Sequence, residues 1–145
     1  MILGLGLDIV KISRIEKIYD KFGEGFLEKI FTKNEIIKVN SFSSQVKKRE
    51  FLAKRFAAKE AAAKALGTGF SQGVFMKDIS IDNDENGQPS LTFTNGAHKK
   101  LMEKIPNDHT PNIHITLTDE PPYADAMVII EALPKNTPNI KWSKK

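Results

Sequence analysis

The chain has 145 residues, a length that suits one domain with a single hydrophobic core. Hydrophobic residues make up 40% and charged residues 28%, as in ordinary soluble globular proteins, and the lack of cysteine excludes disulfides and thiolate chemistry. No apolar run approaches membrane-spanning length, and the net charge of +4 favours an acidic partner or a phosphorylated ligand.

The N-terminal segment is expected to form a strand over residues 2–10 with two unlike faces. Four apolar side chains alternate with two glycines and an aspartate, namely Leu3, Leu5, Leu7 and Ile9 against Gly4, Gly6 and Asp8. Two glycines on one face indicate that something packs closely there, and Asp8 is either a strand-end carboxylate or part of a ligand site. The segment has no basic stretch and carries an acid, so it does not resemble a signal peptide, and we expect a cytoplasmic protein.

Two capping boxes predict the next helices. Ser13 with Glu16 opens a helix whose outer face is basic, and Thr32 with Glu35 opens a second helix that runs through Val39. A short amphipathic turn lies between them, and the outer face of the first helix is formed by Lys11, Arg14, Lys17 and Lys21.

A long central helix is predicted from Phe51, and Gly67 caps its C-terminus. Glu60 and Lys64 share one helix face, while Arg55 and Lys59 form a second row. The simplest alternative is that Glu60 and Lys64 are an ordinary i,i+4 ion pair on a solvated face.

The C-terminal half is predicted to be rich in strands. Residues 74–82 and 90–94 flank the hairpin signal Asn86-Gly87, and Asn95 is expected to cap a helix that ends near residue 105. Two more strands are expected over residues 114–118 and 124–133. The pattern predicts an α+β domain over residues 1–133, in which an antiparallel sheet is packed against the long central helix through its apolar face. The basic tail, residues 134–145, is expected to be mobile or to dock on a neighbour.

Asp8 and Glu60 are candidate ligands for one Mg²⁺ ion, because this ion is usually held by one or two carboxylates together with water and substrate phosphates. Positive charge near such phosphates would come from Arg55, Lys59 and Lys64. The backbone of Gly67 and Gly69 could approach the same ligand closely. The sequence alone does not show that Asp8 meets Glu60.

Three segments resemble the holo-acyl-carrier-protein synthase family, the small 4′-phosphopantetheinyl transferases. They are GLGLDIVKISRI near the N-terminus, the step from Thr32 to Glu35, and RFAAKEAAAKALGTG in the central helix. The resemblance extends from Met1 to about Leu133. It implies a phosphopantetheinyl transferase fold and transfer of 4′-phosphopantetheine from coenzyme A to a serine of apo-acyl carrier protein, in support of fatty acid biosynthesis. The other product would be adenosine 3′,5′-bisphosphate.

The resemblance also implies roles for particular residues. Asp8 and Glu60 match the magnesium ligands, Lys64 matches a lysine near the pyrophosphate, and Arg14 matches a basic position that docks the carrier protein. Coenzyme A-binding positions are matched by Arg55, Lys59, Lys64, Gly67 and Gly69. The family works as a homotrimer with active sites between subunits. One departure is that the family's Ser-His-Ser or Ser-His-Thr is replaced here by Leu117-Thr118-Asp119-Glu120.

The identity of the general base is left open by the sequence. Glu60 is the first candidate, acting directly or through a metal-bound water, and a water held by Glu35 is the second. Two other functions compete with the transferase. The chain could bind nucleic acid through its Lys and Arg rows, although it lacks an aromatic-rich binding motif, or it could hydrolyse phosphoesters without a protein acceptor.

Overall fold

The computed structural model describes residues 1–136 and forms an α+β fold, as predicted. Its elements follow the chain in this order: β1 (Ile2–Lys11), α1 (Ile12–Phe22), α2 (Glu24–Ile30), α3 (Lys33–Asn40), α4 (Gln45–Leu66), the 3₁₀ helix η1 (Met76–Asp78), β2 (Ile79–Asn83), β3 (Pro89–Phe93), α5 (Asn95–Lys104), β4 (His109–Glu120) and β5 (Tyr123–Pro134).

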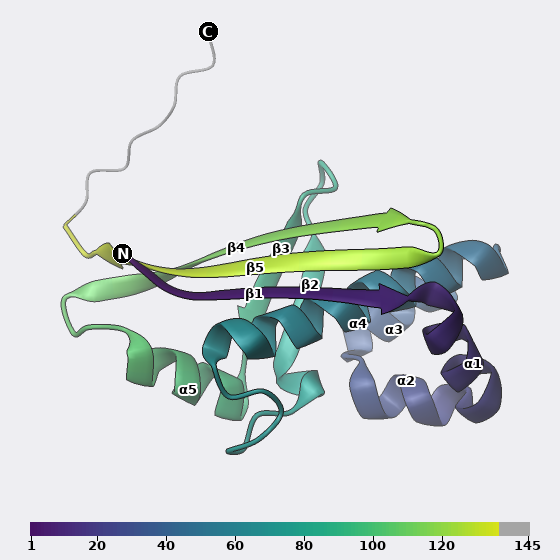
Figure 1. Ribbon diagram of the computed structural model, residues 1–145, viewed down its shortest axis with the longest axis horizontal. Coiled ribbons are helices and arrows are strands. Elements are labelled where there is room, and N and C mark those ends of the chain that lie inside the picture. Colours follow the sequence, from purple (N-terminus) through teal and green to yellow (C-terminus); the bar gives the residue numbers. More distant parts are fainter. Residues whose placement is uncertain (137–145) are drawn as a thin grey trace, which may run out of the picture.

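Two antiparallel sheets frame the long helix α4. The larger sheet has the strand order β1-β5-β4, and β2 and β3 form a separate hairpin. Figure 1 shows the three long strands as one layer with the helices gathered on one side of it. Because α4 packs against all three of these strands and also contacts α1, α3, α5 and β2, it forms the centre of the core.

The face of β1 that packs on α4 is the opposite of the one predicted. Leu5, Leu7 and Ile9 are 60–63% exposed on the outer side of the sheet, whereas Gly6 is buried against the helix. A Cβ built on Gly4 would lie 2.0 Å from the carbonyl oxygen of Ala65, and one built on Gly6 would lie 1.8 Å from that of Ala61. The helix therefore occupies the bare face because only glycine allows so close a backbone approach.

Helix α4 begins and ends at recognisable caps. The Ser44 side chain accepts a hydrogen bond from the Lys47 N–H at its start, so the helix begins six residues before the predicted Phe51. At its end Gly67 adopts the left-handed conformation with φ of 76°, as predicted.

Some predicted boundaries were wrong for local reasons. Ser13 does not cap α1, because β1 runs directly into the helix and the first amide, of Ile12, donates to the Pro122 carbonyl. Helix α5 has Thr94 as its N-cap, while the Asn95 side chain donates to Asp78. The capping box of Thr32 and Glu35 is confirmed.

Other elements differ mainly in extent. The predicted turn between the first two helices is the helix α2, and the strand expected over residues 74–82 is shortened to β2 by η1. Strands β4 and β5 are longer than predicted. At the end of β5, the Lys135 N–H donates to Asp108, and the rest of the predicted tail, residues 137–145, lies outside the described residues.

Replacing Gly6 by alanine is expected to destabilise the fold by about 1–3 kcal/mol, because the new methyl group would overlap the Ala61 carbonyl. Urea denaturation measures the loss. Gly25→Ala is the matched control, since a Cβ at Gly25 meets no described atom within 4 Å and the residue lies in a helix, where alanine is favoured by about 0.5–1 kcal/mol. Equally small changes in the free energy of unfolding for the two variants would show that β1 can move off the helix without destabilising the fold.

Candidate active site

The candidate site forms where the close contact between β1 and α4 ends. Gly4, Gly6 and Asp8 follow one another along one face of the strand, and the glycines rest on successive turns of α4. This contact carries Asp8 to the helix face that displays Glu60 and Lys64.

Asp8 and Lys64 form a direct ion pair. The Lys64 ammonium lies 2.9 Å from Asp8 Oδ1 and donates a second hydrogen bond of 3.0 Å to the Leu7 carbonyl oxygen. The Asp8 side chain is 16% exposed and that of Lys64 is 53% exposed. The lysine therefore bridges the strand and the helix while it remains open to a ligand.

Glu60 lies within electrostatic range of the same pair. Burial raises the pKa of Glu60 above its ordinary value of 4.5, and the nearby charge of Asp8 raises it further, while Lys64 and Arg14 act in the opposite direction. A carboxylate whose charged form is destabilised by a neighbouring acid gains from a cation placed between the two. The two acids that the sequence left unconnected are therefore neighbours within one chain.

Comparison with known sequences identifies the family. The sequence model of the 4′-phosphopantetheinyl transferase superfamily matches residues 4–118, which include most of β1, the whole of α4 and most of β4. The chain belongs to this superfamily. The part that matches contains Asp8, Glu60 and Lys64.

Close relatives within the superfamily share nearly the whole chain. The holo-[acyl-carrier-protein] synthase of Methylorubrum populi is 49% identical over 134 residues, which cover 92% of this chain and 96% of the relative. That of Agrobacterium fabrum is 48% identical over 136 residues, which cover 94% and 99% of the two chains.

Solved structures support the same fold. The holo-[acyl-carrier-protein] synthase from Neisseria meningitidis matches with a TM-score of 0.78 and 35% identity over 90% of this chain and 99% of its own. The enzyme from Bacillus anthracis, solved in complex with CoA (3′,5′-ADP), matches with a TM-score of 0.73 and 35% identity over 92% and 99%.

The acid pair fits a divalent metal ion. No cluster of three or more potential His, Asp or Glu ligands occurs among residues 1–136. A pair is sufficient for Mg²⁺, because this ion commonly keeps several waters and takes further oxygens from substrate phosphates. The raised pKa of Glu60 beside Asp8 is the observation that favours a cation here.

Arg14 approaches the site from α1. Its guanidinium carbon lies 5.9 Å from the centre of the Phe56 ring, and its charge lowers the pKa of Glu60. The residue is exposed on the helix. Arg14 thus connects the basic surface of α1 with the acid pair.

Lys59 lies elsewhere than predicted. Its side chain is fully buried, and its ammonium binds Glu35 at 2.9 Å and the carbonyl oxygens of Met76 and Ile79. Burial lowers the pKa of Lys59, and the charge of Glu35 opposes that shift. An ammonium with its three donors used inside the core is not available to coenzyme A, so the coenzyme A role predicted for Lys59 is wrong, and the residue links α4 to α3 and β2.

The same network argues against Glu35 as the holder of a catalytic water. Glu35 is 2% exposed, and its two carboxylate oxygens accept hydrogen bonds from the Thr32 and Ile81 amides as well as from Lys59. With both oxygens engaged in the core, Glu35 serves the fold, and Glu60 stays the better candidate for the base.

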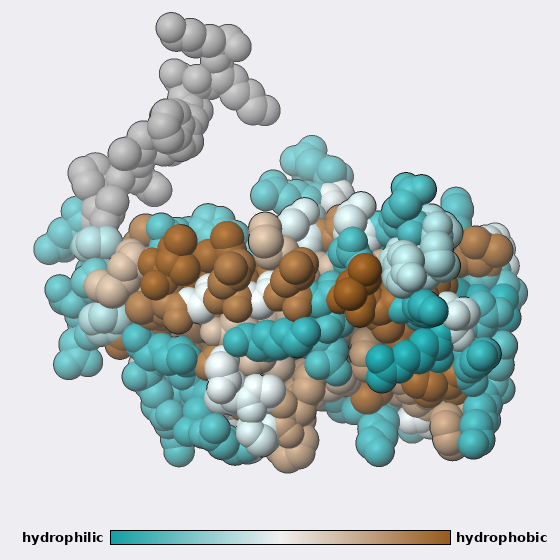
Figure 2. All heavy atoms as spheres, viewed as in Figure 1, coloured by the Kyte–Doolittle hydropathy of each residue, from teal (hydrophilic) through white to brown (hydrophobic). Residues whose placement is uncertain are grey.

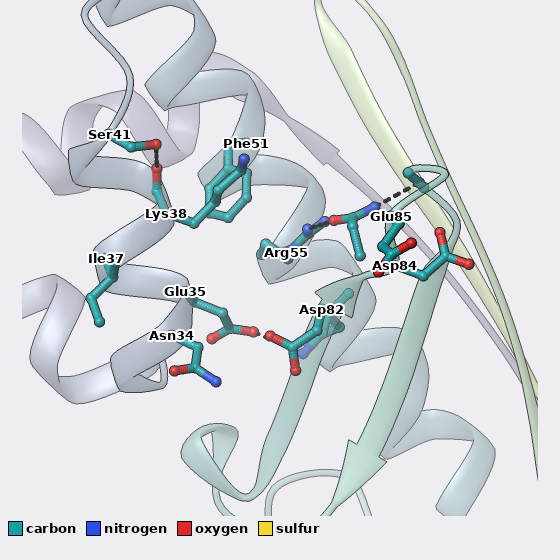
Figure 3. Close-up of a pocket in the computed structure, with 13 residues that line it drawn as sticks. Asn34, Glu35, Ile37, Lys38, Ser41, Phe51, Arg55, Asp82, Asp84 and Glu85 are labelled. Carbon is teal, nitrogen blue, oxygen red and sulfur yellow. Dashed lines mark hydrogen bonds between the residues drawn. The ribbon is translucent and has the colours of Figure 1, made fainter.

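Arg55 lines a groove on another side of α4. Figure 3 shows it with Glu35 and Asp82 among the residues that line this groove. The groove has a volume of about 750 Å³. Its guanidinium donates to Asn83 Oδ1 and stacks 4.5 Å from the centre of the Phe51 ring. Glu60 follows Arg55 by five helical positions, a rotation of about 140°, so the structure does not bring Arg55 to the acid pair of its own chain.

The two predicted glycines lie in the loop that follows α4. Both have positive φ values, 76° for Gly67 and 56° for Gly69, and the Gly69 N–H donates to the Ala63 carbonyl oxygen at 3.2 Å. The loop therefore turns back onto the last turn of the helix, next to Lys64 in sequence.

Sequence reasoning missed several residues of the groove beside Arg55. Phe51, Lys54 and Asn83 surround it, but they come from a helix and a hairpin whose contact no sequence pattern announces. Asp119, which stands where the family motif has histidine, pairs with Lys54 at 2.8 Å. His114 binds Glu131 at 2.8 Å on the outer face of the sheet.

Replacing Glu60 by glutamine is expected to raise the melting temperature at neutral pH. The pKa of the folded carboxyl lies above 4.5, so the folded protein holds the proton more tightly than the unfolded chain. The charged Glu60 carboxylate therefore destabilises the folded protein. This destabilisation grows as the pH rises from the pKa of the unfolded carboxyl to that of the folded one, and it is constant at higher pH.

Thermal melts without added metal at about pH 4 and about pH 8 test this expectation. The gain should be present at the higher pH and nearly absent at the lower one. Glu28→Gln, on the exposed side of α2, removes the same charge outside the site and is the control. A melting temperature lowered at both pH values would mean that the Glu60 carboxylate stabilises the fold.

Proposed function

We propose that the protein transfers 4′-phosphopantetheine from coenzyme A to a serine of apo-acyl carrier protein, with Mg²⁺ as its cofactor. The observation that carries the proposal is the convergence of Asp8, Glu60 and Lys64 at the end of β1, in a chain that is 49% identical to a holo-[acyl-carrier-protein] synthase. In this role the protein would act in the cytoplasm and support fatty acid biosynthesis.

The residues provide what the reaction needs. The serine oxygen attacks the β-phosphorus of coenzyme A, and the bond to the bridging oxygen breaks, so adenosine 3′,5′-bisphosphate leaves with that electron pair. Bound Mg²⁺ would be held by Asp8 and Glu60 and would neutralise charge on the pyrophosphate. Lys64, which is half exposed, adds positive charge beside it.

Glu60 is the proposed acceptor of the serine proton, either directly or through a water. Its raised pKa suits this role, because a base works best when its pKa is closer to the operating pH. Arg55, Gly67 and Gly69 are proposed to bind other parts of coenzyme A.

The carrier protein is proposed to dock on α1. Arg14 and three lysines form an exposed basic surface that ends beside Glu60: Lys11, Lys17 and Lys21. Acyl carrier proteins are acidic, so opposite charges would steer the encounter and deliver the serine close to the base.

We further propose that the active molecule is a homotrimer that closes over the outer face of the β1-β5-β4 sheet. Figure 2 shows apolar side chains gathered in a row along this side of the molecule. Leu5, Leu7 and Ile9 contribute to the row from β1, and Met127, opposite Leu7 on β5, extends it. An apolar face of this kind favours burial against another copy. Because Arg55 and Glu60 point to different sides of α4, a coenzyme that touches both would bridge two copies.

Mass spectrometry of apo-acyl carrier protein incubated with the protein, coenzyme A and Mg²⁺ tests the transfer. The expected result is a mass gain of one phosphopantetheine arm. Glu60→Gln is expected to lower the rate of this transfer by about 100-fold or more. Glu28→Gln is the control, and its transfer rate is expected to equal that of the wild type. Hydrolysis of coenzyme A without an acceptor would favour the phosphoester hydrolase, and salt-dependent RNA or DNA binding without turnover would favour the nucleic-acid binder.

Replacing Leu7 by glutamate is expected to convert the trimer into monomers, because a charge would be buried in the apolar face. Size-exclusion chromatography with light scattering measures the mass. Val46→Glu is the matched control, since Val46 is 62% exposed, compared with 63% for Leu7, and lies at the start of α4 rather than on a strand of the sheet. A monomeric wild type, or a trimer that survives Leu7→Glu, would contradict the proposed interface.

A further inference from the structure

Helix α1 carries two acids beside the basic surface that is proposed to dock the carrier protein. Glu16 and Asp20 are four residues apart, so they share one helix face, which lies next to the basic face. Each acid directly precedes a lysine of the basic surface, Lys17 or Lys21. Exposed charges are screened only beyond about 8 Å at physiological salt, so both carboxylates act on a molecule that approaches this surface. Left unpaired, they would repel an acidic partner.

Arg49, which comes from the start of α4, pairs with both acids. Its Nη1 lies 3.1 Å from Glu16 Oε1, and its Nη2 lies 3.3 Å from Asp20 Oδ1. The Arg49 side chain is 27% exposed, compared with 37% for Glu16 and 55% for Asp20. One guanidinium therefore holds both carboxylates against α4 and offsets part of their charge.

The stability of the fold does not account for a charge at this position. Ion pairs between partly exposed side chains contribute little to folding. The Arg49 Nε is buried and has no hydrogen-bond partner among the described residues, which costs free energy. Arg49 also borders a groove together with Ile12, Val46 and Pro122, where an apolar side chain would find apolar neighbours. The guanidinium is therefore better explained by its effect on the charge of α1 than by a contribution to the core.

We propose that Arg49 is a positioning residue for recognition of the carrier protein. It holds Glu16 and Asp20 against α4 and offsets their charge, so that α1 presents positive charge to an acidic partner. The inference rests on the proposed function, which places the carrier protein on α1. Opposite charges across an interface speed the encounter of two proteins, whereas like charges disfavour it. Without Arg49, the two acids would be unpaired beside the docking surface.

Steady-state transfer kinetics with apo-acyl carrier protein as the varied substrate test this role. Arg49→Met, which keeps a long side chain without its charge, is expected to raise KM for the carrier protein about fivefold and to leave kcat and KM for coenzyme A unchanged. Arg49→Lys should keep most of the wild-type KM. Lys100→Met is the matched control, since Lys100 is 24% exposed and pairs with Glu103 at 2.8 Å on α5. Its kinetic constants should equal those of the wild type.

A double-mutant cycle separates an effect through the acids from a direct contact. In a chain that carries both Glu16→Gln and Asp20→Asn, Arg49→Met should change KM for the carrier protein by less than about twofold, because no acid remains to be held. A loss of about fivefold in both backgrounds would mean that Arg49 itself contacts the carrier protein, which would overturn the positioning role. Salt at about 0.5 M should reduce the difference between the wild type and Arg49→Met, because exposed charges are then screened.

Thermal melts of the same variants test the structural alternative. Arg49→Met should melt no lower than the wild type, because it removes an unpaired buried donor together with two weak ion pairs. A lower melting temperature together with a fall in kcat would show that Arg49 acts by holding α1 in the fold. An unchanged KM for the carrier protein would show that the two acids need no pairing. Either result overturns the proposal.

The proposed function can fail separately. Binding of labelled apo-acyl carrier protein, measured by fluorescence anisotropy without coenzyme A, reports the docking step without turnover. Binding that depends on Arg49 in the absence of any transfer would remove the transferase reaction and leave the role of Arg49. Normal transfer with an unchanged Arg49→Met variant would remove only that role. A wild type that neither binds nor modifies the carrier protein would overturn both.

Discussion

The structure depends on the direct contact between the backbone of β1 and helix α4. Gly4 and Gly6 lie against the carbonyl oxygens of Ala65 and Ala61, at distances that any side chain on the strand would occupy. Because this contact brings the strand onto the helix, Asp8 arrives beside Lys64 and Glu60 without a long loop or a flexible side chain to connect them. The same contact turns the apolar side chains of β1 outward, so the candidate active site and the proposed subunit interface have one physical origin.

Helix α4 separates its charged residues by face, and each face has a different task. Glu60 and Lys64 meet Asp8 at the acid pair, whereas Arg55 and Lys54 border a groove on another side of the helix. Lys59 points into the core, where its pairing with Glu35 and two carbonyl groups compensates for the loss of water. Alanine on most of the remaining positions lets strands and helices approach the helix from every side.

Much of the fold could be predicted where the signal is local. The capping box of Thr32 and Glu35, the left-handed Gly67 and the Asn86-Gly87 hairpin each depend on residues within a few positions of one another, and all three are present. The start of α1 could not be predicted in this way, because the Pro122 carbonyl that receives its first amide comes from the far end of the chain. The boundaries that failed are therefore those fixed by distant partners.

The sequence by itself pointed to the residues that we propose to carry the chemistry, because carboxylates, a lysine and glycines at these spacings match a known family and suit a bound diphosphate. Only the tertiary structure decided which side of β1 faces inward, since an alternating strand presents two faces and the closest backbone approach selected the bare one. It also decided that Lys59 is buried while Lys64 is open. Both are lysines on one helix, and what separates them is the position of Glu35, which the chain brings from another helix.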